Sequence, residues 1–79
     1  MRGSRETIVK RSVKVAGHNT SVSLEDEFWT EIKLIAEERG MSVAALIAEI
    51  DQTRKTANLS SALRLAVLGE LKRKLADRS

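Results

Sequence analysis

The fold is decided by one stretch, residues 20–29, which reads TSVSLEDEFW. Its first half alternates, because Val22 and Leu24 are apolar and each follows a serine. This period of two is typical of a half-buried β-strand. Its second half opens with three acidic residues, which suit the positive end of a helix dipole. The stretch therefore predicts a short strand that passes directly into a helix.

Three helices are expected from the apolar spacing that follows this strand. The first covers residues 25–39 and ends before Gly40, a residue typical of helix C-termini. The second covers residues 43–53 and is capped by Ser42. The third covers roughly residues 60–76. The predicted fold class is mainly α, with one short strand region and a third, C-terminal helix.

The strand needs a partner, because its backbone groups cannot stay unpaired in a folded protein. A second alternating segment, residues 12–16, precedes Gly17. Either this segment folds back on residues 20–24 through a turn at Gly17, or residues 20–24 pair with their copy in a second chain. We favour the pairing across a homodimer, because it also stabilises a very small domain.

The length of the chain supports that choice. A domain of 79 residues buries too little surface to be more than marginally stable. It has no cysteine for a disulfide and a single histidine, too few for a structural zinc site. Oligomerisation is the remaining means of stabilisation. The apolar residues expected in the dimer core are Val22, Leu24, Trp29, Ile32, Ile35, Leu46 and Ile50.

Several classes of protein are excluded by composition. No apolar run approaches the length of a membrane span, and no signal-peptide core follows the start. Without a thiol, a tyrosine or a second imidazole, the chain has no nucleophile–base pair for an enzyme. His18 lies beside Gly17 and is interpreted as a loop residue. We expect no cofactor and no metal, and the lack of cysteine fits the cytoplasm.

Charge is distributed unevenly along the chain. Residues 1–14 carry five Lys or Arg against one Glu, and residues 60–79 carry five against two acids. Basic segments at both ends indicate a polyanionic partner. We expect four parts: a flexible basic arm at residues 1–11, a core at residues 12–53, a linker at residues 54–59 and a C-terminal helix at residues 60–79.

The start of the second helix has the character of an anion site. Its first turn, Val43-Ala44-Ala45, carries no acidic residue, whereas the first helix begins with three. Its backbone N–H groups are therefore available to a phosphate after Ser42. Together with the basic arm, this gives the residues expected to contact the phosphates of a polyanion: Ser42, Val43, Lys10, Arg11 and Lys14.

Two segments, residues 20–29 and residues 35–43, resemble the ribbon-helix-helix family closely. The run from Ala16 to Glu25 is similar to a bacterial subfamily of small ribbon-helix-helix proteins, as is the later segment Asn58–Arg64. The chain departs from the wider family at Glu25, where many members carry proline. It also has serines on the strand where others carry Arg, Lys or Gln.

The resemblance implies an intertwined homodimer whose two strands form an antiparallel ribbon in the major groove of DNA. Its base-reading positions are Asn19, Ser21 and Ser23 here, and its phosphate contact lies at the second helix. We expect a bacterial transcriptional regulator, bound to the nucleoid in the cytoplasm. The alternative is an antitoxin or adaptor that binds a partner protein through the basic arm or the helix carrying Leu63–Leu75.

Overall fold

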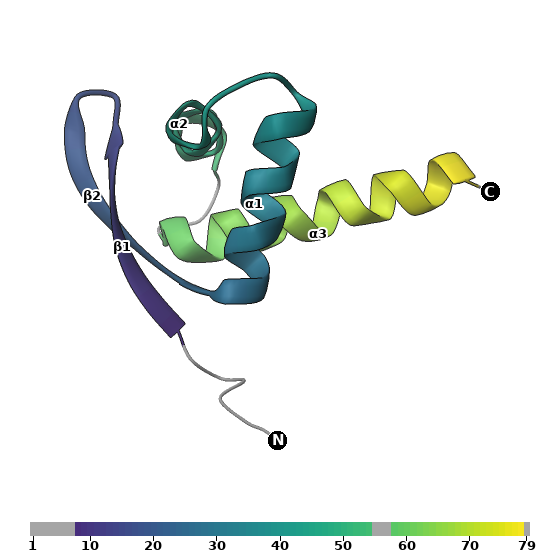
Figure 1. Ribbon diagram of the computed structural model, residues 1–79, viewed down its shortest axis with the longest axis horizontal. Coiled ribbons are helices and arrows are strands. Elements are labelled where there is room, and N and C mark those ends of the chain that lie inside the picture. Colours follow the sequence, from purple (N-terminus) through teal and green to yellow (C-terminus); the bar gives the residue numbers. More distant parts are fainter. Residues whose placement is uncertain (1–7, 55–57, 79) are drawn as a thin grey trace.

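A two-stranded hairpin and three helices make up the structure, with the hairpin against one side of the helices (Figure 1). The computed structural model describes residues 8–54 and 58–78. No helix in these two ranges is long and apolar enough to cross a membrane. The elements are β1 Ile8–Val15, β2 His18–Glu25, α1 Asp26–Glu38, α2 Val43–Thr53 and α3 Leu59–Arg78.

The hairpin is closed by a two-residue turn. β1 and β2 pair antiparallel along their full length, from Ile8 opposite Glu25 to Val15 opposite His18. The turn residues Ala16 and Gly17 both have positive φ, 53° and 84°. Two positive φ angles are what a type I′ turn requires, and its twist matches that of the flanking strands. Local geometry thus returns the chain onto itself at this point.

This pairing corrects the preferred expectation that residues 20–24 pair with a second chain. The strand partner is β1 of the same chain, so the alternative of a turn at Gly17 is the one confirmed. The flexible arm was expected to end at residue 11, but residues 8–11 belong to β1. The paired strand begins at Ile8 and includes Val9, both branched residues of high β propensity.

The core lies between the inward face of the hairpin and all three helices. Val15, Val22 and Leu24 point into it from the strands. The helices contribute Ile32, Ile35, Ala36, Leu46, Ile47, Ala62, Leu63 and Val67. The core is therefore closed within one chain.

Closure by α3 changes the role of the residues expected to form a dimer core. Five of the seven, Val22, Leu24, Ile32, Ile35 and Leu46, are buried within one chain, and Trp29 and Ile50 are half-buried. α3 covers them from within the same chain, and their place in a dimer core stays a prediction. Leu63 and Val67 of that helix are 0% and 1% exposed.

Backbone and side-chain caps fix the helix ends. Gly40, with φ of 68°, ends α1: its N–H bonds the carbonyl of Glu37, and the Met41 N–H bonds that of Ala36. These two bonds form a Schellman motif. At the start of α2 the Ser42 hydroxyl accepts a hydrogen bond from the Ala45 N–H at 3.0 Å. The Asn58 side chain caps α3 in the same way.

Two leucine substitutions test whether α3 belongs to the core. Leu63→Ala removes a fully buried side chain and should lower the free energy of unfolding by about 2–5 kcal/mol, because a cavity remains. Leu34→Ala changes a leucine of α1 that is 44% exposed and should change it by less than about 0.5 kcal/mol. Urea denaturation followed by circular dichroism measures both. Equal losses would contradict a core closed by α3.

Candidate nucleic-acid interface

The outward side of the hairpin is polar except at Ile8, the first residue of β1. Strand side chains alternate, so the valines face the core and the residues between them face away. Four cross-strand pairs lie on this side. Ile8 opposite Glu25 ends the hairpin, and the other three pairs, six residues in all, are Lys10 opposite Ser23, Ser12 opposite Ser21, and Lys14 opposite Asn19. All six are exposed except Ser23, which is half-buried. We call these six residues the ribbon face.

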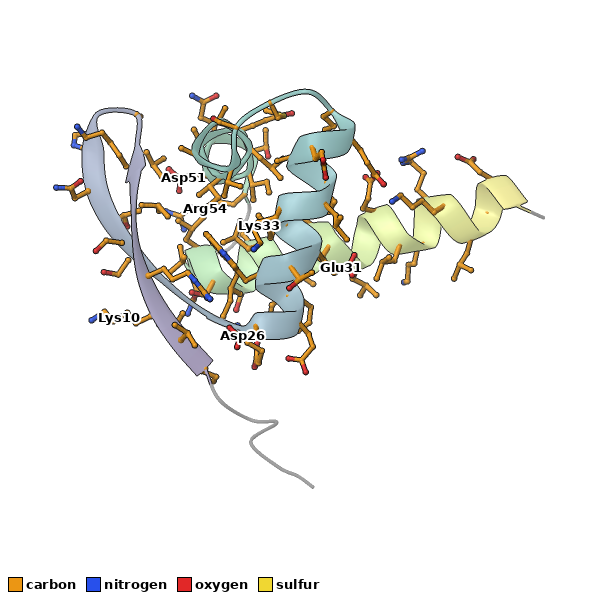
Figure 2. All side chains as sticks on the ribbon, viewed as in Figure 1. Lys10, Asp26, Glu31, Lys33, Asp51 and Arg54 are labelled. Atoms are coloured by element: carbon orange, nitrogen blue, oxygen red, sulfur yellow. The ribbon has the colours of Figure 1, made fainter. Side chains whose placement is uncertain are left out.

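The ribbon face is basic. Residues 10–24 contain no Asp or Glu, and the carboxylate that ends β2 on this side, that of Glu25, is paired with Arg64. Figure 2 shows Lys10 extending away from the helices. Ammonium, hydroxyl and amide groups together can donate to phosphate oxygens and to base edges. The chemistry of this face therefore suits a polyanion that presents hydrogen-bond acceptors.

The structure places all three base-reading candidates from the sequence on this face. Asn19 and Ser21 are exposed, and the Ser23 hydroxyl is not used as a helix cap, because the N-cap of α1 is Glu25. Two of the phosphate candidates, Lys10 and Lys14, lie on the same face, on the neighbouring strand. In the sequence, Lys14 lies between Val13 and Val15, and this alternation predicts that its side chain faces away from the core.

Arg11 lies on the opposite side of β1, against α1. Its guanidinium carbon is 4.6 Å from the centre of the Trp29 ring, and Nη2 donates to Asp26 Oδ1 at 3.0 Å. A cation over the face of an aromatic ring is attracted by the ring quadrupole. The side chain is only 27% exposed. Arg11 thus holds β1 to the start of α1 and is not part of the ribbon face.

The end of β2 is held by α3. The Ser23 N–H donates to Ser60 Oγ at 3.0 Å, and the Ser23 carbonyl accepts from Arg64 Nη2 at 3.3 Å. Arg64 also donates from Nε to Glu25 Oε1 at 3.1 Å and lies 5.7 Å from the Phe28 ring. Sequence reasoning missed both α3 residues, since nothing in local spacing connects positions about forty residues apart.

The start of α2 retains two backbone donors. The hydroxyl and carbonyl of Ser42 accept from the N–H groups of Ala45 and Leu46. The N–H groups of Val43 and Ala44 take no part in these bonds, and the first turn of α2 carries no acidic residue. Ala44 is exposed, so its side chain does not cover the helix end from solvent.

A cavity of about 670 Å³ lies between the first half of β2 and the α2–α3 junction. Its walls include His18, Asn19 and the ion pair of Asp51 with Arg54, whose atoms Oδ1 and Nε are 2.7 Å apart. Figure 2 shows this pair between the hairpin and α2. Residues 8–54 and 58–78 hold no cluster of three His, Asp or Glu that could bind a metal ion. Opposite charges on one wall give this cavity no preference for an ion of either sign.

The outer side of α3 carries a row of exposed leucines. The exposed fractions of Leu65, Leu68, Leu71 and Leu75 are 56%, 47%, 41% and 64%. We call these four residues the leucine row. The sequence analysis offered the helix carrying Leu63–Leu75 as the surface for a protein partner, and Leu63 itself is buried in the core. The helix is apolar on two sides.

Comparison with known proteins identifies a family. Residues 8–71 match the ribbon-helix-helix domain. The structure is similar to that of an uncharacterized protein from Bordetella pertussis Tohama I, with a TM-score of 0.77 and 30% sequence identity. The match covers 99% of this chain and 67% of that chain. No curated protein matches the chain.

The bond between Arg64 and Glu25 should make stability depend on pH. The pKa of Glu25 is lowered by a hydrogen bond from its own backbone amide and by the hydrogen bond from Arg64. A lowered folded-state pKa stabilises the fold above the unfolded-state value, and this contribution is lost as the pH falls through the folded-state value. Arg64→Gln should therefore reduce the loss of stability between pH 7 and pH 3, measured by urea denaturation at each pH.

Glu25→Gln is the matched variant for this measurement. It removes the titrating carboxyl itself and should also flatten the dependence on pH. Adding Arg64→Gln to it should have no further effect on that dependence, because both act through one group. A pH profile identical to that of the wild type in both single variants would contradict the role of this ion pair.

Proposed function

Because the chain belongs to the ribbon-helix-helix family, whose members are generally DNA-binding proteins, we propose that it is a homodimeric, sequence-specific DNA-binding protein. We further propose that it regulates transcription in a bacterium, on the nucleoid in the cytoplasm. The family is typically non-enzymatic, and binding alone is the proposed activity. The observation that carries the proposal is the ribbon face, six mostly exposed residues with two lysines and no carboxylate among them, on a hairpin fixed to the helices.

Sequence reading is assigned to β2. Asn19 can make a bidentate contact with adenine, and the hydroxyls of Ser21 and Ser23 can bond several bases. The major groove admits a two-stranded β-ribbon. The helices lie behind the hairpin, so they do not stand between this face and DNA (Figure 1).

We assign the contacts with DNA phosphates to Lys10, Lys14 and the start of α2 at Ser42 and Val43. Lysine supplies a mobile positive charge, and a helix N-terminus supplies N–H donors with a positive dipole end. Arg11, the other candidate from the sequence, is left out of this assignment because Asp26 and Trp29 hold its guanidinium on the core side.

Dimer formation is assigned to the leucine row. The family binds DNA as dimers, while the ribbon and core of this chain are complete in one copy. β2 offers little room for a second strand at its end, since Ser60 and Arg64 occupy the outer backbone groups of Ser23. Exposed apolar rows of this kind mark protein contacts. A second copy, packed through its own α3, would cover the row.

DNA binding is tested with a duplex that the wild-type protein enriches from a randomised pool, compared with a scrambled duplex. About six to eight ionic contacts per dimer should give a log–log dependence of affinity on salt with a slope of about −5 to −7. The double variant Asn19→Ala, Ser21→Ala should lose preference for the enriched duplex and keep its affinity for the scrambled one. Fluorescence anisotropy measures both affinities.

Ala44→Glu is the comparison for that experiment. A carboxylate at the start of α2 should repel phosphate and weaken binding to both duplexes by the same factor. Circular dichroism checks that each variant folds. No enrichment of any sequence by the wild type would overturn the proposed function, and full preference in the Asn19/Ser21 double variant would remove β2 as the reader.

The dimer is tested by sedimentation at micromolar concentration. The wild type should sediment with twice the chain mass of 8.8 kDa. Leu68→Gln with Leu71→Gln places polar groups in the leucine row and should yield a folded monomer. Leu34→Gln, at an exposed leucine of α1, should leave the dimer intact.

A monomeric wild type would overturn this assignment and favour a second candidate function. The observation that favours it is again the leucine row, which a different protein could cover. The chain would then act as an adaptor or antitoxin that binds its partner through α3.

A further inference from the structure

The two halves of α3 are held in different ways. Residues 59–67, the inner half, place Ala62, Leu63 and Val67 in the core. Beyond Val67, no side chain of α3 that the structure describes is buried. Figure 1 shows this end of the helix extending past α1 to the C-terminus. Core packing therefore fixes the inner half and leaves residues 70–78, the outer half, to other contacts.

Ion pairs attach the outer half to the corner between α1 and α2. Arg39, the C-cap of α1, donates from Nη2 to Glu70 Oε1 at 3.3 Å, and its Nη1 lies 3.8 Å from Glu49 Oε2 of α2. One turn further along α3, Lys74 Nζ lies 2.9 Å from the carboxylate of Glu38 in α1. We call these five residues the ion-pair cluster. It links all three helices through charged side chains.

The surroundings of the cluster make it sensitive to salt. The Glu70 side chain is 10% exposed and also bonds Arg73 of the same helix, so two arginines share its carboxylate. An isolated surface pair contributes little to stability, whereas charges that form a network contribute more. The other four members are between 39% and 54% exposed. Raising the salt from about 0.1 M to about 1 M shortens the Debye length from about 10 Å to about 3 Å, so salt should loosen the outer half.

Gly69 separates the two halves. Glycine is a poor helix former, and alanine at the same place would favour the helix. A Cβ at Gly69 would meet no atom within 4 Å, so no contact in the described part of the chain calls for glycine here. The helix is thus weakest next to the point where core packing ends.

We propose that the outer half opens as a separate unit, bounded by Gly69 and kept helical by the ion-pair cluster, and that the leucine row is complete only while this unit is closed. A helical segment this short is not stable in water without tertiary contacts. Leu71 and Leu75 lie beyond Gly69, apart from the other two leucines of the row, so opening divides the row. The opening is a property of one chain and goes beyond the proposed function; only its effect on the dimer rests on that function.

Native-state hydrogen exchange of the full chain, resolved by NMR, tests whether the unit opens separately. Leu63→Ala weakens the core and should speed exchange in residues 63–67 more than about tenfold. Residues 73–77 should keep their rates, because the outer half opens while Leu63 stays packed. Faster exchange by the same factor in both halves would show that α3 opens as one piece and overturn the proposal. Val67→Ala repeats the test should Leu63→Ala fail to fold.

Glu38→Gln tests the cluster from outside α3, whose own sequence it leaves unchanged. Loss of the pair with Lys74 should speed exchange in residues 73–77 about two- to fivefold at low salt. The wild type at about 1 M salt, corrected for the exchange rate of an unfolded peptide, should show a similar increase. Glu37→Gln is the matched control, because it removes the same charge from the preceding residue, which lies outside the cluster. Equal effects of the two variants, or exchange that does not respond to salt, would overturn the role of the cluster.

Gly69→Ala tests the boundary of the unit. Alanine favours the helix and its methyl group meets no neighbour, so exchange in residues 73–77 should slow about three- to fivefold. Unchanged exchange there would mean that Gly69 stays helical when the outer half opens, and would overturn the boundary.

The variant Leu68→Gln with Leu71→Gln separates the cluster from a second copy. It is expected to be a monomer, so protection that remains in residues 73–77 comes from the chain itself. We expect exchange there within about threefold of the wild type, since leucine and glutamine are similar helix formers. Full loss of protection in this variant would assign the order of the outer half to the partner copy and overturn the proposal.

The link to the leucine row is tested by sedimentation. Glu38 lies in α1 and is not part of the row, yet Glu38→Gln should shift the dimer toward the monomer, because it opens the outer half. Glu37→Gln should cause no such shift. A dimer that Glu38→Gln leaves unchanged would overturn this link and leave the opening itself standing. A wild type without DNA binding would overturn the proposed function, and none of the exchange results depends on that binding.

Discussion

The return of the chain at Ala16 and Gly17 is the constraint on which the rest of the structure depends. Two consecutive residues with positive φ direct β1 back along β2 in a fixed register. Because side chains alternate, that register decides which residues face the core and which face solvent. A slip of one residue would bury the lysines and expose the valines. The core and the ribbon face are therefore set by the same turn.

The position of α3 follows from this arrangement. With β1 already paired to β2, the inward valines still need a cover that α1 and α2 alone do not provide. Leu63 and Val67 supply it, while Ser60 and Arg64 bond the outer backbone groups of Ser23. One segment of α3 thus closes the core and occupies the end of a strand edge that would otherwise invite pairing with another chain.

Local patterns predicted most of the elements. The bounds of α2 agree with the structure, those of α1 lie within one residue, and the two alternating segments on either side of Gly17 left a turn there as one of two possibilities. The strand partner was predicted wrongly, because alternation shows which face is buried and not which strand supplies the hydrogen bonds. Arg64 could not be predicted as a partner of Ser23, since their contact depends on tertiary packing.

Three carboxylates lie at the junction of β2 and α1. Glu25, Asp26 and Glu27 stabilise the start of α1, yet they lie next to a surface proposed to bind a polyanion. Two of the three carboxylates are paired: Arg64 bonds Glu25 and Arg11 bonds Asp26. Each arginine therefore does two things, since it fixes a strand to a helix and reduces the negative charge beside the ribbon face. An acidic helix start can in this way adjoin a surface that binds phosphate.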